Sequence, residues 1–232
     1  MNKEFLTLVM PVYNEKRTLK EIVKKVLELD ILKELIIVDD GSTDGTRELI
    51  KSSDFGPKVK KLFHGKNTGK GSALSTGFKN AAGEIIAVQD ADLEYDPEEF
   101  KELTRPILRG VADVVYGSRL SGGKPQRVYM FWHKLGNSAI TLTANILYNS
   151  TLTDLETCYK AFKRDVIKGI DIKSKGFSVE PEITAKILKK KHLRIYEIPI
   201  SYYGRTYEEG KKITWRQGIS AIATLFWYRF FD

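Results

Sequence analysis

Short acidic segments that directly follow apolar runs are the residues of this sequence best suited to chemistry. Asp39–Asp44 (DDGSTD) follows one run and Asp90–Glu94 (DADLE) follows another. Carboxylates gathered at one place repel each other unless a positive group joins them, and hard divalent cations take oxygen ligands. In the second segment Asp90, Asp92 and Glu94 are alternate residues, so an extended backbone points them the same way. The pattern predicts acidic turns that converge on a divalent cation.

Other acidic residues in these regions have a simpler explanation. Asp44 and Asp96 stand where helices are expected to begin, and Pro97 follows Asp96. Asp is a favoured helix cap and Pro a favoured first helical residue. We therefore interpret Asp44 and Asp96 as caps.

The glycine-rich segment Asn67–Ala73 (NTGKGSA) suggests a phosphate-binding loop. It does not match the P-loop pattern, because Lys70 is followed by Gly71 where that pattern has Ser or Thr. No G-x-G-x-x-G fingerprint follows the first apolar run, so an ATPase or a dehydrogenase is disfavoured. Lys70 opens an expected helix and could face an anion there.

Apolar runs and amphipathic stretches alternate in the first half, which predicts a single-domain α/β fold with a mainly parallel sheet. The runs expected to be strands are Phe5–Met10, Leu35–Val38, Val59–Phe63, Ile85–Val88 and Val111–Tyr116. The stretches expected to be helices are Lys16–Leu29, Asp44–Ser52, Lys70–Ala82 and Pro97–Leu108. Ligands bind at the carboxyl ends of strands in such sheets, where the acidic segments lie.

The second half is less regular. A glycine-rich loop at Gly117–Pro125 precedes an apolar, aromatic segment at Tyr129–Tyr148, and a basic loop spans Gly204–Lys212. The remaining expected elements are strands near Tyr159–Phe162 and Leu193–Pro199, a helix near Glu182–Lys190 and a final helix at Trp215–Phe231.

Composition limits the class of protein. The chain has 232 residues, 42% of them hydrophobic, which suits one large domain. Its lone cysteine, Cys158, excludes an internal disulfide, and neither a signal peptide nor a membrane span is visible. We therefore expect a cytoplasmic protein. The net charge of +8 favours anionic partners, namely nucleic acid, nucleotides, phosphates or an acidic membrane face.

Taken in order, the motifs resemble those of family 2 glycosyltransferases with the GT-A fold, in particular the dolichyl-phosphate mannose synthase-like branch. The motifs that carry the resemblance are PVYNE at Pro11–Glu15, VDDGSTD at Val38–Asp44, NTGKGSA at Asn67–Ala73, DADLE at Asp90–Glu94 and GSRLSGG at Gly117–Gly123. The later loop GRTYEEGKK, Gly204–Lys212, looks like that branch's basic loop beside the active site. Each motif is weak alone, but the ordered set is specific.

The resemblance implies roles for these residues. Asp92 would be the principal ligand of Mg²⁺ or Mn²⁺ and Glu94 the second, although relatives often have Gln at the position of Glu94. Arg119 and Lys211 would hold the diphosphate or an acceptor phosphate, together with Arg205. The residues implied in nucleotide-sugar binding are Pro11, Tyr13, Glu15, Val38, Asp40, Lys70, Asp90 and Ala91.

The resemblance also implies an inverting transfer of a hexose from a GDP- or UDP-sugar. A polyprenyl or dolichyl phosphate acceptor needs no strong base, because its phosphate is largely ionised near neutrality. A sugar or cell-surface glycan hydroxyl would need a carboxylate to take its proton, and Asp154 is the candidate. A nucleotidyltransferase and a basic nucleic-acid-binding module are the alternatives from other classes. The ordered motifs and the acidic clusters argue against both.

The C-terminal stretch carries aromatic residues beside cations. This mixture is typical of helices that lie in a membrane interface, although a helix packed on the core has the same pattern. We expect residues 1–212 to form the catalytic domain and 213–232 an amphipathic helix. Any membrane contact would be peripheral, on the cytoplasmic face. The oligomeric state cannot be inferred from the sequence.

Overall fold

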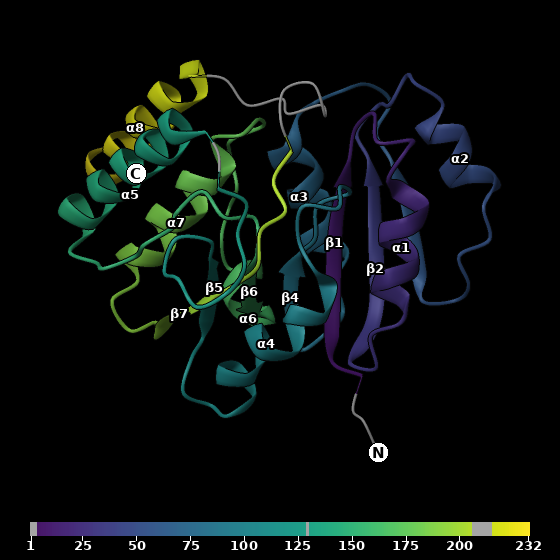
Figure 1. Ribbon diagram of the computed structural model, residues 1–232, viewed down its shortest axis with the longest axis horizontal. Coiled ribbons are helices and arrows are strands. Elements are labelled where there is room, and N and C mark those ends of the chain that lie inside the picture. The colour runs from purple at the N-terminus through teal and green to yellow at the C-terminus, as the bar shows by residue number, and fades with distance from the viewer. Residues whose placement is uncertain (1–3, 129, 206–214) are drawn as a thin grey trace.

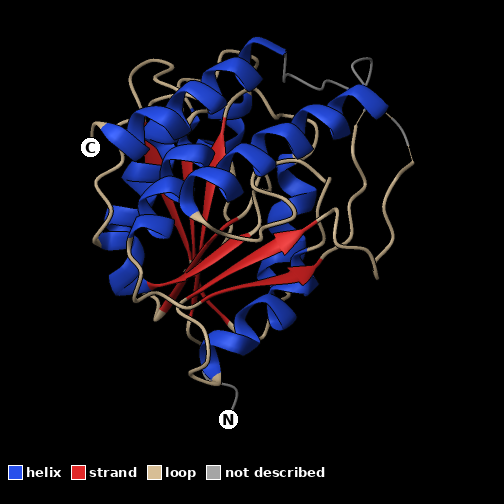
Figure 2. Ribbon diagram, turned by 90° about the vertical axis from the view of Figure 1, so that its left-hand side faces the viewer, coloured by secondary structure: helices blue, strands red, loops and turns tan. Residues whose placement is uncertain are grey.

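A seven-stranded sheet forms the centre of the protein, with helices on both faces (Figures 1 and 2). The computed structural model describes residues 4–128, 130–205 and 215–232. The strands are β1 (Leu6–Val12), β2 (Leu32–Asp39), β3 (Val59–Phe63), β4 (Ile85–Val88), β5 (Val114–Ser118), β6 (Lys160–Lys163) and β7 (Ile195–Pro199). They lie in the order β3-β2-β1-β4-β6-β5-β7. Only β6 runs antiparallel to its neighbours among these strands, which confirms the predicted mainly parallel α/β sheet.

The helices alternate with the strands in the first half of the chain, as predicted. They are α1 (Leu19–Leu27), α2 (Thr46–Ser52), α3 (Lys70–Asn80), the 3-10 turn η1 (Pro97–Glu99), α4 (Phe100–Leu108), α5 (Phe131–Tyr148), α6 (Arg164–Lys168), α7 (Val179–Lys189) and α8 (Trp215–Phe230). The side chain of Asp96 accepts a hydrogen bond from Glu98 N and caps η1. The cap predicted at Asp96 is therefore confirmed. Asp44 accepts from Thr46 N, but Gly45 is the N-cap of α2, so the cap predicted at Asp44 is one residue too early.

Two apolar clusters fill the spaces between the sheet and its helices. Alternate residues of β1 point to opposite faces, so Leu8 packs in the cluster that includes α1 and α4, and Val9 packs in the cluster that includes α3 and α7. A third cluster joins α5, α7 and α8 through Ala144, Ala185 and Leu225. The core therefore fixes both the sheet and the helices at its edge.

Some element boundaries differ from those predicted from the sequence. The predicted strand Val111–Tyr116 is β5 at Val114–Ser118, because the backbone N–H groups of Val111 and Ala112 bond to Pro106 O and extend the turn after α4. Helix α7 begins at Val179 and not near Glu182, since Pro181 is tolerated in a first turn. The short helix α6 was not predicted.

Helices α5 and α8 lie side by side at one edge of the molecule (Figure 1). Helix α8 buries Ala221, Leu225 and Tyr228 against α5 and α7. No helix in the described ranges is long and apolar enough to cross a membrane. The predicted boundary at residue 212 lies outside the described residues.

Candidate active site

The motif residues come together because parallel strands end at one edge of the sheet. Strands β1, β2, β4 and β5 all end there, and the antiparallel β6 begins there. The segments that follow β1, β2, β4 and β5 therefore face the same region as the segment that precedes β6. This arrangement places Glu15, Asp40, Asp92, Arg119 and Asp154 at the same edge.

Several of the residues implied in nucleotide-sugar binding lie where β1 and β2 end. Pro11 pairs with Val38 across the ladder, and Val38 is fully buried. Beyond β1 the backbone of Asn14 is left-handed, with φ 55°, and its side-chain oxygen accepts from Thr43 N at 2.8 Å. This turn leaves Tyr13 38% exposed beside Pro11, as a side chain that stacks on a ligand would be.

Asp40 secures the loop that precedes α3. Its carboxylate accepts from Gly69 N at 2.7 Å, from the Thr68 hydroxyl at 2.8 Å and from Thr68 N, and it contacts His64 Nδ1 at 2.7 Å. Gly41 is required beside it, because a Cβ there would lie 2.4 Å from Asn67 N. All of these contacts bind Asp40 to residues 64–69.

The glycines of NTGKGSA serve close packing of the chain. A Cβ on Gly71 would lie 2.0 Å from Ser174 O, and one on Gly69 would lie 2.4 Å from Lys175 O. The start of α3 thus lies against the segment that leads to α7. The ammonium of Lys70 points to a carboxylate of the protein itself, Asp90, at 2.9 Å.

Lys70 and Asp90 belong to a buried network of charges. Lys70 Nζ also contacts Cys158 Sγ at 3.0 Å and Glu180 at 3.5 Å, and Glu180 is paired with the buried Lys160. Burial opposes the charged form of Lys70, but Asp90 and Glu180 raise the pKa of its ammonium well above the ordinary value. The same Lys70 charge outweighs burial at Asp90 and lowers the pKa of that carboxyl. The network fixes Asp90 beside Asp92.

Asp92 and Glu94 converge on the guanidinium of Arg205. Asp92 Oδ2 lies 2.8 Å from Arg205 Nη2, and Glu94 Oε1 lies 3.4 Å from Nε and accepts from Arg205 N at 2.8 Å. Glu15 contacts the same guanidinium at 3.4 Å. Burial, together with the charges of Asp90 and Glu94, raises the pKa of Asp92 to about 7. The guanidinium of Arg205 is the cation that stabilises this cluster of carboxylates.

The same carboxylates determine whether a divalent metal can bind at this edge of the sheet. Two oxygen-donor side chains, Asp92 and Glu94, already face one positive group, and hard cations prefer such ligands. The pair can therefore hold a metal, with further ligands from a bound diphosphate. In the described part of the chain no three His, Cys, Asp or Glu side chains gather closely enough to form a metal site. The expectation that separate acidic turns converge on one cation is thus wrong for Asp40, which holds the 64–69 loop.

Arg119 is held by Asp154 in a two-pronged ion pair. Nε lies 2.6 Å from Oδ2 and Nη2 lies 2.7 Å from Oδ1. Asp154 is fully buried and also accepts from Asn137 Nδ2 at 2.8 Å. Burial would raise the pKa of Asp154, but the charge and hydrogen bonds of Arg119 lower it below the ordinary value. Arg119 also contacts the hydroxyl of Tyr95 at 3.3 Å and lies over the ring of Tyr202.

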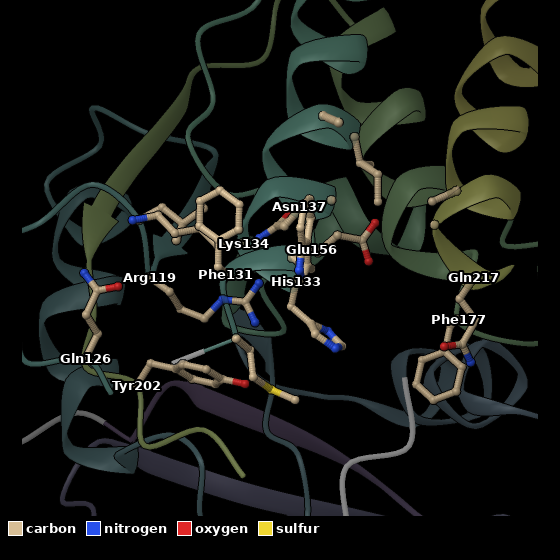
Figure 3. Close-up of a pocket in the computed structure, with 18 of the residues that line it drawn as sticks. Arg119, Gln126, Phe131, His133, Lys134, Asn137, Glu156, Phe177, Tyr202 and Gln217 are labelled. Carbon is tan, nitrogen blue, oxygen red and sulfur yellow. The ribbon is translucent and has the colours of Figure 1, made fainter. Parts of the chain in front are cut away.

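A cavity of about 1630 Å³ opens between this arginine and helices α5 and α8 (Figure 3). Its polar side chains include Arg119, Gln126, Arg127, His133, Lys134, Asn137, Glu156 and Gln217. Its apolar side chains include Leu120, Val128, Phe131, Trp132, Ile140, Phe177, Ile219 and Ile222. The cavity therefore combines cations near Arg119 with an apolar wall from two helices.

The described structure brings most of the predicted site residues to this edge. Ala91 is buried, and its carbonyl accepts from the Thr18 hydroxyl at 2.8 Å. Lys211 lies outside the described residues. Glu156 and Glu180 also lie in this region and were not predicted from the sequence. Glu156 lies two residues after Asp154 in the acidic segment before β6, whereas the position of Glu180 gave no signal.

The fold is that of known sugar-nucleotide enzymes. The chain is similar to the crystal structure of glucosyl-3-phosphoglycerate synthase from Mycobacterium tuberculosis in complex with Mn²⁺, UDP and glucosyl-3-phosphoglycerate. The TM-score is 0.75, over 97% of this chain and 80% of that one, with 20% sequence identity. A complex of the same enzyme with Mg²⁺ and UDP matches with a TM-score of 0.73, 20% identity and coverage of 97% and 79% of the two chains. The predicted GT-A fold is confirmed.

Residues 7–170 match the model of glycosyl transferase family 2, and the chain belongs to that family. It is 29% identical to the dolichol-phosphate mannosyltransferase of Pyrococcus furiosus, over 89% of this chain and 58% of the relative. It is 28% identical to the UDP-N-acetylglucosamine–dolichyl-phosphate N-acetylglucosaminyltransferase of Methanococcus voltae, over 86% of each chain. The chain thus spans little more than half the length of the first of these relatives. The predicted kinship with dolichyl-phosphate glycosyltransferases is confirmed.

Proposed function

We propose that this protein transfers a hexose from a nucleotide sugar to a polyprenyl phosphate by a single inverting displacement. The observation that carries the proposal is the position of the acidic pair. Asp92 and Glu94 lie against Arg205 at the sheet edge, and Tyr202 links that edge to Arg119 and the cavity, through its hydroxyl to Glu94 and its ring under the guanidinium. A donor site and an acceptor site would therefore adjoin.

The donor side would hold the nucleotide against Pro11, Tyr13 and Val38, with its diphosphate near Asp92. A relative named for UDP-N-acetylglucosamine and a structural neighbour that contains UDP support a nucleotide sugar. Mn²⁺ and Mg²⁺ in neighbouring structures support a divalent metal on Asp92 and Glu94. Such a metal neutralises charge on the departing diphosphate. When Arg205 leaves the acidic pair, its guanidinium can bind diphosphate oxygens.

The acceptor side is the cavity between Arg119 and helices α5 and α8. A phosphate would bind the cations that line it, Arg119, Arg127 and Lys134, and an apolar chain would lie along Phe131 and Ile222. The names of both relatives include a dolichyl or dolichol phosphate. A cavity lined by both cationic and apolar side chains suits an acceptor that has an anionic head and a long apolar tail.

Asp154 would position Arg119. From the sequence, Asp154 was the candidate general base for a hydroxyl acceptor. Both of its oxygens are bonded to Arg119, and its pKa is lowered, so it is a poor base. A phosphate acceptor needs no base, because its oxygen is already ionised when it attacks the anomeric carbon.

The exposed aromatic residues of α5 and α8 would meet the membrane that carries such a lipid. Trp132 is 77% exposed on α5, and Phe230 and Phe231 are 64% and 72% exposed at the end of α8. Arg229 adds a positive charge beside them. Exposed aromatics with adjacent cations favour the interface of an anionic bilayer, so we infer peripheral contact along these two helices.

A donor screen followed by a turnover assay tests the function. GDP- and UDP-sugars are each added with Mn²⁺ or Mg²⁺, and the thermal shift identifies the bound nucleotide. Transfer of radiolabelled sugar to a short-chain polyprenyl phosphate is then measured against a simple glycoside acceptor. Stabilisation by one donor and transfer to the phosphate alone are expected. Transfer only to the glycoside would contradict the proposal.

A further inference from the structure

Glu156 occupies an unusual position for a carboxylate. It lies in the segment between Asp154 and β6 and lines the cavity that also contains Arg119 (Figure 3). Its Oε1 atom is buried and has no hydrogen-bond partner in the described part of the chain. Buried carboxyl oxygens are nearly always bonded. A carboxyl that lines a cavity and has an unmatched oxygen is suited to bond a ligand that enters the cavity.

The charges that face Glu156 come from every element around it. The nearest are Glu180 on α7, Lys160 on β6, Arg119 after β5 and Asp154 in its own segment. His133 and Lys134 on α5, with Arg127, line the same cavity. Burial, followed by the negative charge of Glu180, raises the pKa of Glu156 to about 7, although Lys160 and Arg119 oppose the shift. The neutral form is therefore accessible near neutrality.

A phosphate in this cavity would strengthen the preference for the neutral form. An ionised Glu156 would repel a phosphate monoester, whereas a protonated carboxyl can donate a hydrogen bond to it. The second pKa of a phosphate monoester is about 6, close to that of Glu156. Binding brings a second anion to the carboxyl and so raises its proton affinity further.

We propose that Glu156 recognises the acceptor in its protonated form, by donating a hydrogen bond from its carboxyl group to the acceptor phosphate. This inference rests on the proposed function and names a specificity residue for it. Above neutrality Glu156 takes up a proton from solvent as the phosphate binds, whereas below neutrality it already carries the proton. During transfer a phosphate oxygen bonds to the anomeric carbon as the bond to the diphosphate breaks, so no proton is lost and Glu156 keeps its own.

The test compares the pH dependence of the acceptor KM in the wild type and in Glu156→Gln, which is permanently neutral and retains a donor. Above about pH 7 the wild-type KM should rise by about tenfold per pH unit, as expected when one proton must be taken up. The KM of Glu156→Gln should stay flat over the same range. Glu48→Gln, which neutralises an exposed carboxylate on α2, should follow the wild-type profile.

A measurement on the wild type needs no variant. Titration of a short-chain polyprenyl phosphate into the protein, in buffers of different ionisation enthalpy at about pH 8, should show uptake of up to about one proton per site. No proton uptake, or parallel KM profiles in the wild type and Glu156→Gln, would overturn the role of Glu156 while transfer to the phosphate still supports the function. A kcat that rises through pH 7 and is lost in Glu156→Gln would make Glu156 a general base and overturn the proposal. Absence of transfer to polyprenyl phosphate at every pH would overturn both.

Discussion

The guanidinium of Arg205 lies 2.8 Å from the carboxylate of Asp92 and also contacts Glu94. A residue of the basic loop thus bonds to the same two carboxylates that suit a divalent metal. A guanidinium and a metal cannot occupy one pair of oxygens together. Metal binding and release of Arg205 are therefore expected to be linked, and the freed guanidinium would turn to the diphosphate.

Replacement of Arg205 by Ala should strengthen metal binding and weaken turnover. Without the competing guanidinium, the Mn²⁺ concentration for half-maximal thermal shift should fall by about tenfold, since the side-chain contacts of Arg205 with Asp92 and Glu94 no longer need to break. The kcat/KM for the donor should fall because a diphosphate contact is lost. Arg109→Ala, an exposed arginine after α4, is the control. Unchanged or weaker Mn²⁺ binding in Arg205→Ala would refute the competition.

Replacement of Asp92 by Ala should abolish metal-dependent turnover and leave the fold intact. Loss of one preorganised electrostatic group at a reacting centre costs on the order of a hundredfold or more in kcat. The fold should tolerate the change, because burial and like charges already disfavour the ionised form of Asp92. Asp165→Ala removes an exposed carboxylate of α6 as a control. Full activity of Asp92→Ala at any metal concentration would remove Asp92 from the metal site.

The pair formed by Arg119 and Asp154 should act as one unit. Asp154→Asn cannot accept both hydrogen bonds of the guanidinium, so its activity should fall about as far as that of Arg119→Ala, and the double variant should be little worse. Breaking a buried pair from one side costs about 3–5 kcal/mol of stability, so assays belong well below each melting temperature. Strictly multiplicative losses would show that Asp154 acts apart from Arg119.

The ionisation of Glu156 should be visible in stability as well as in KM. Its pKa is raised from 4.5 to about 7 in the folded protein. The stabilisation is therefore complete below about pH 4.5 and is lost as the pH rises through about 7. Relative to Glu156→Gln, the wild type should lose on the order of 1–3 kcal/mol between about pH 5 and pH 8. Denaturant unfolding of both proteins at the two pH values measures this difference, and equal changes would contradict the assigned pKa.

Substitution of exposed aromatics on α8 should reduce membrane binding. Deleting the helix would be a poor test, because Leu225 and Tyr228 are part of a buried cluster. The variant with Trp227, Phe230 and Phe231 changed to Ser keeps that cluster and should co-sediment severalfold less with anionic liposomes. Tyr196→Ser removes an exposed aromatic from β7 as a control. Equal partitioning of all three proteins would exclude contact through α8.

The sequence predicted the fold well where local signals agree with the tertiary structure. Short-range causes that can be recognised in one sequence explain the buried runs of β1, β2 and β4 and the cap Asp96. The direction of β6 could not be predicted, because it depends on pairing with β4 and β5, which are distant in the chain.

The site was harder to predict than the fold. The residue types indicated Asp92 and Glu94 as candidate metal ligands, but they did not reveal that Arg205 contacts both carboxylates. Asp40 is a carboxylate, a residue type that binds metal ions, yet it accepts hydrogen bonds from Thr68 and Gly69. Such partners are fixed by tertiary packing, so one sequence does not reveal which carboxylates are already bonded.

The reversed direction of β6 places the segments proposed for the donor and for the acceptor at one sheet edge but on different parts of the chain. Strands β1, β2 and β4 lead into the segments proposed to hold the donor, whereas the chain that enters β6 carries Glu156, proposed to meet the acceptor, and Asp154, which holds Arg119. Substitutions in the segment that precedes β6 can therefore alter the acceptor preference without changing the geometry of the proposed donor site. A swap of residues 151–158 between members of the family should accordingly transfer acceptor preference without the donor.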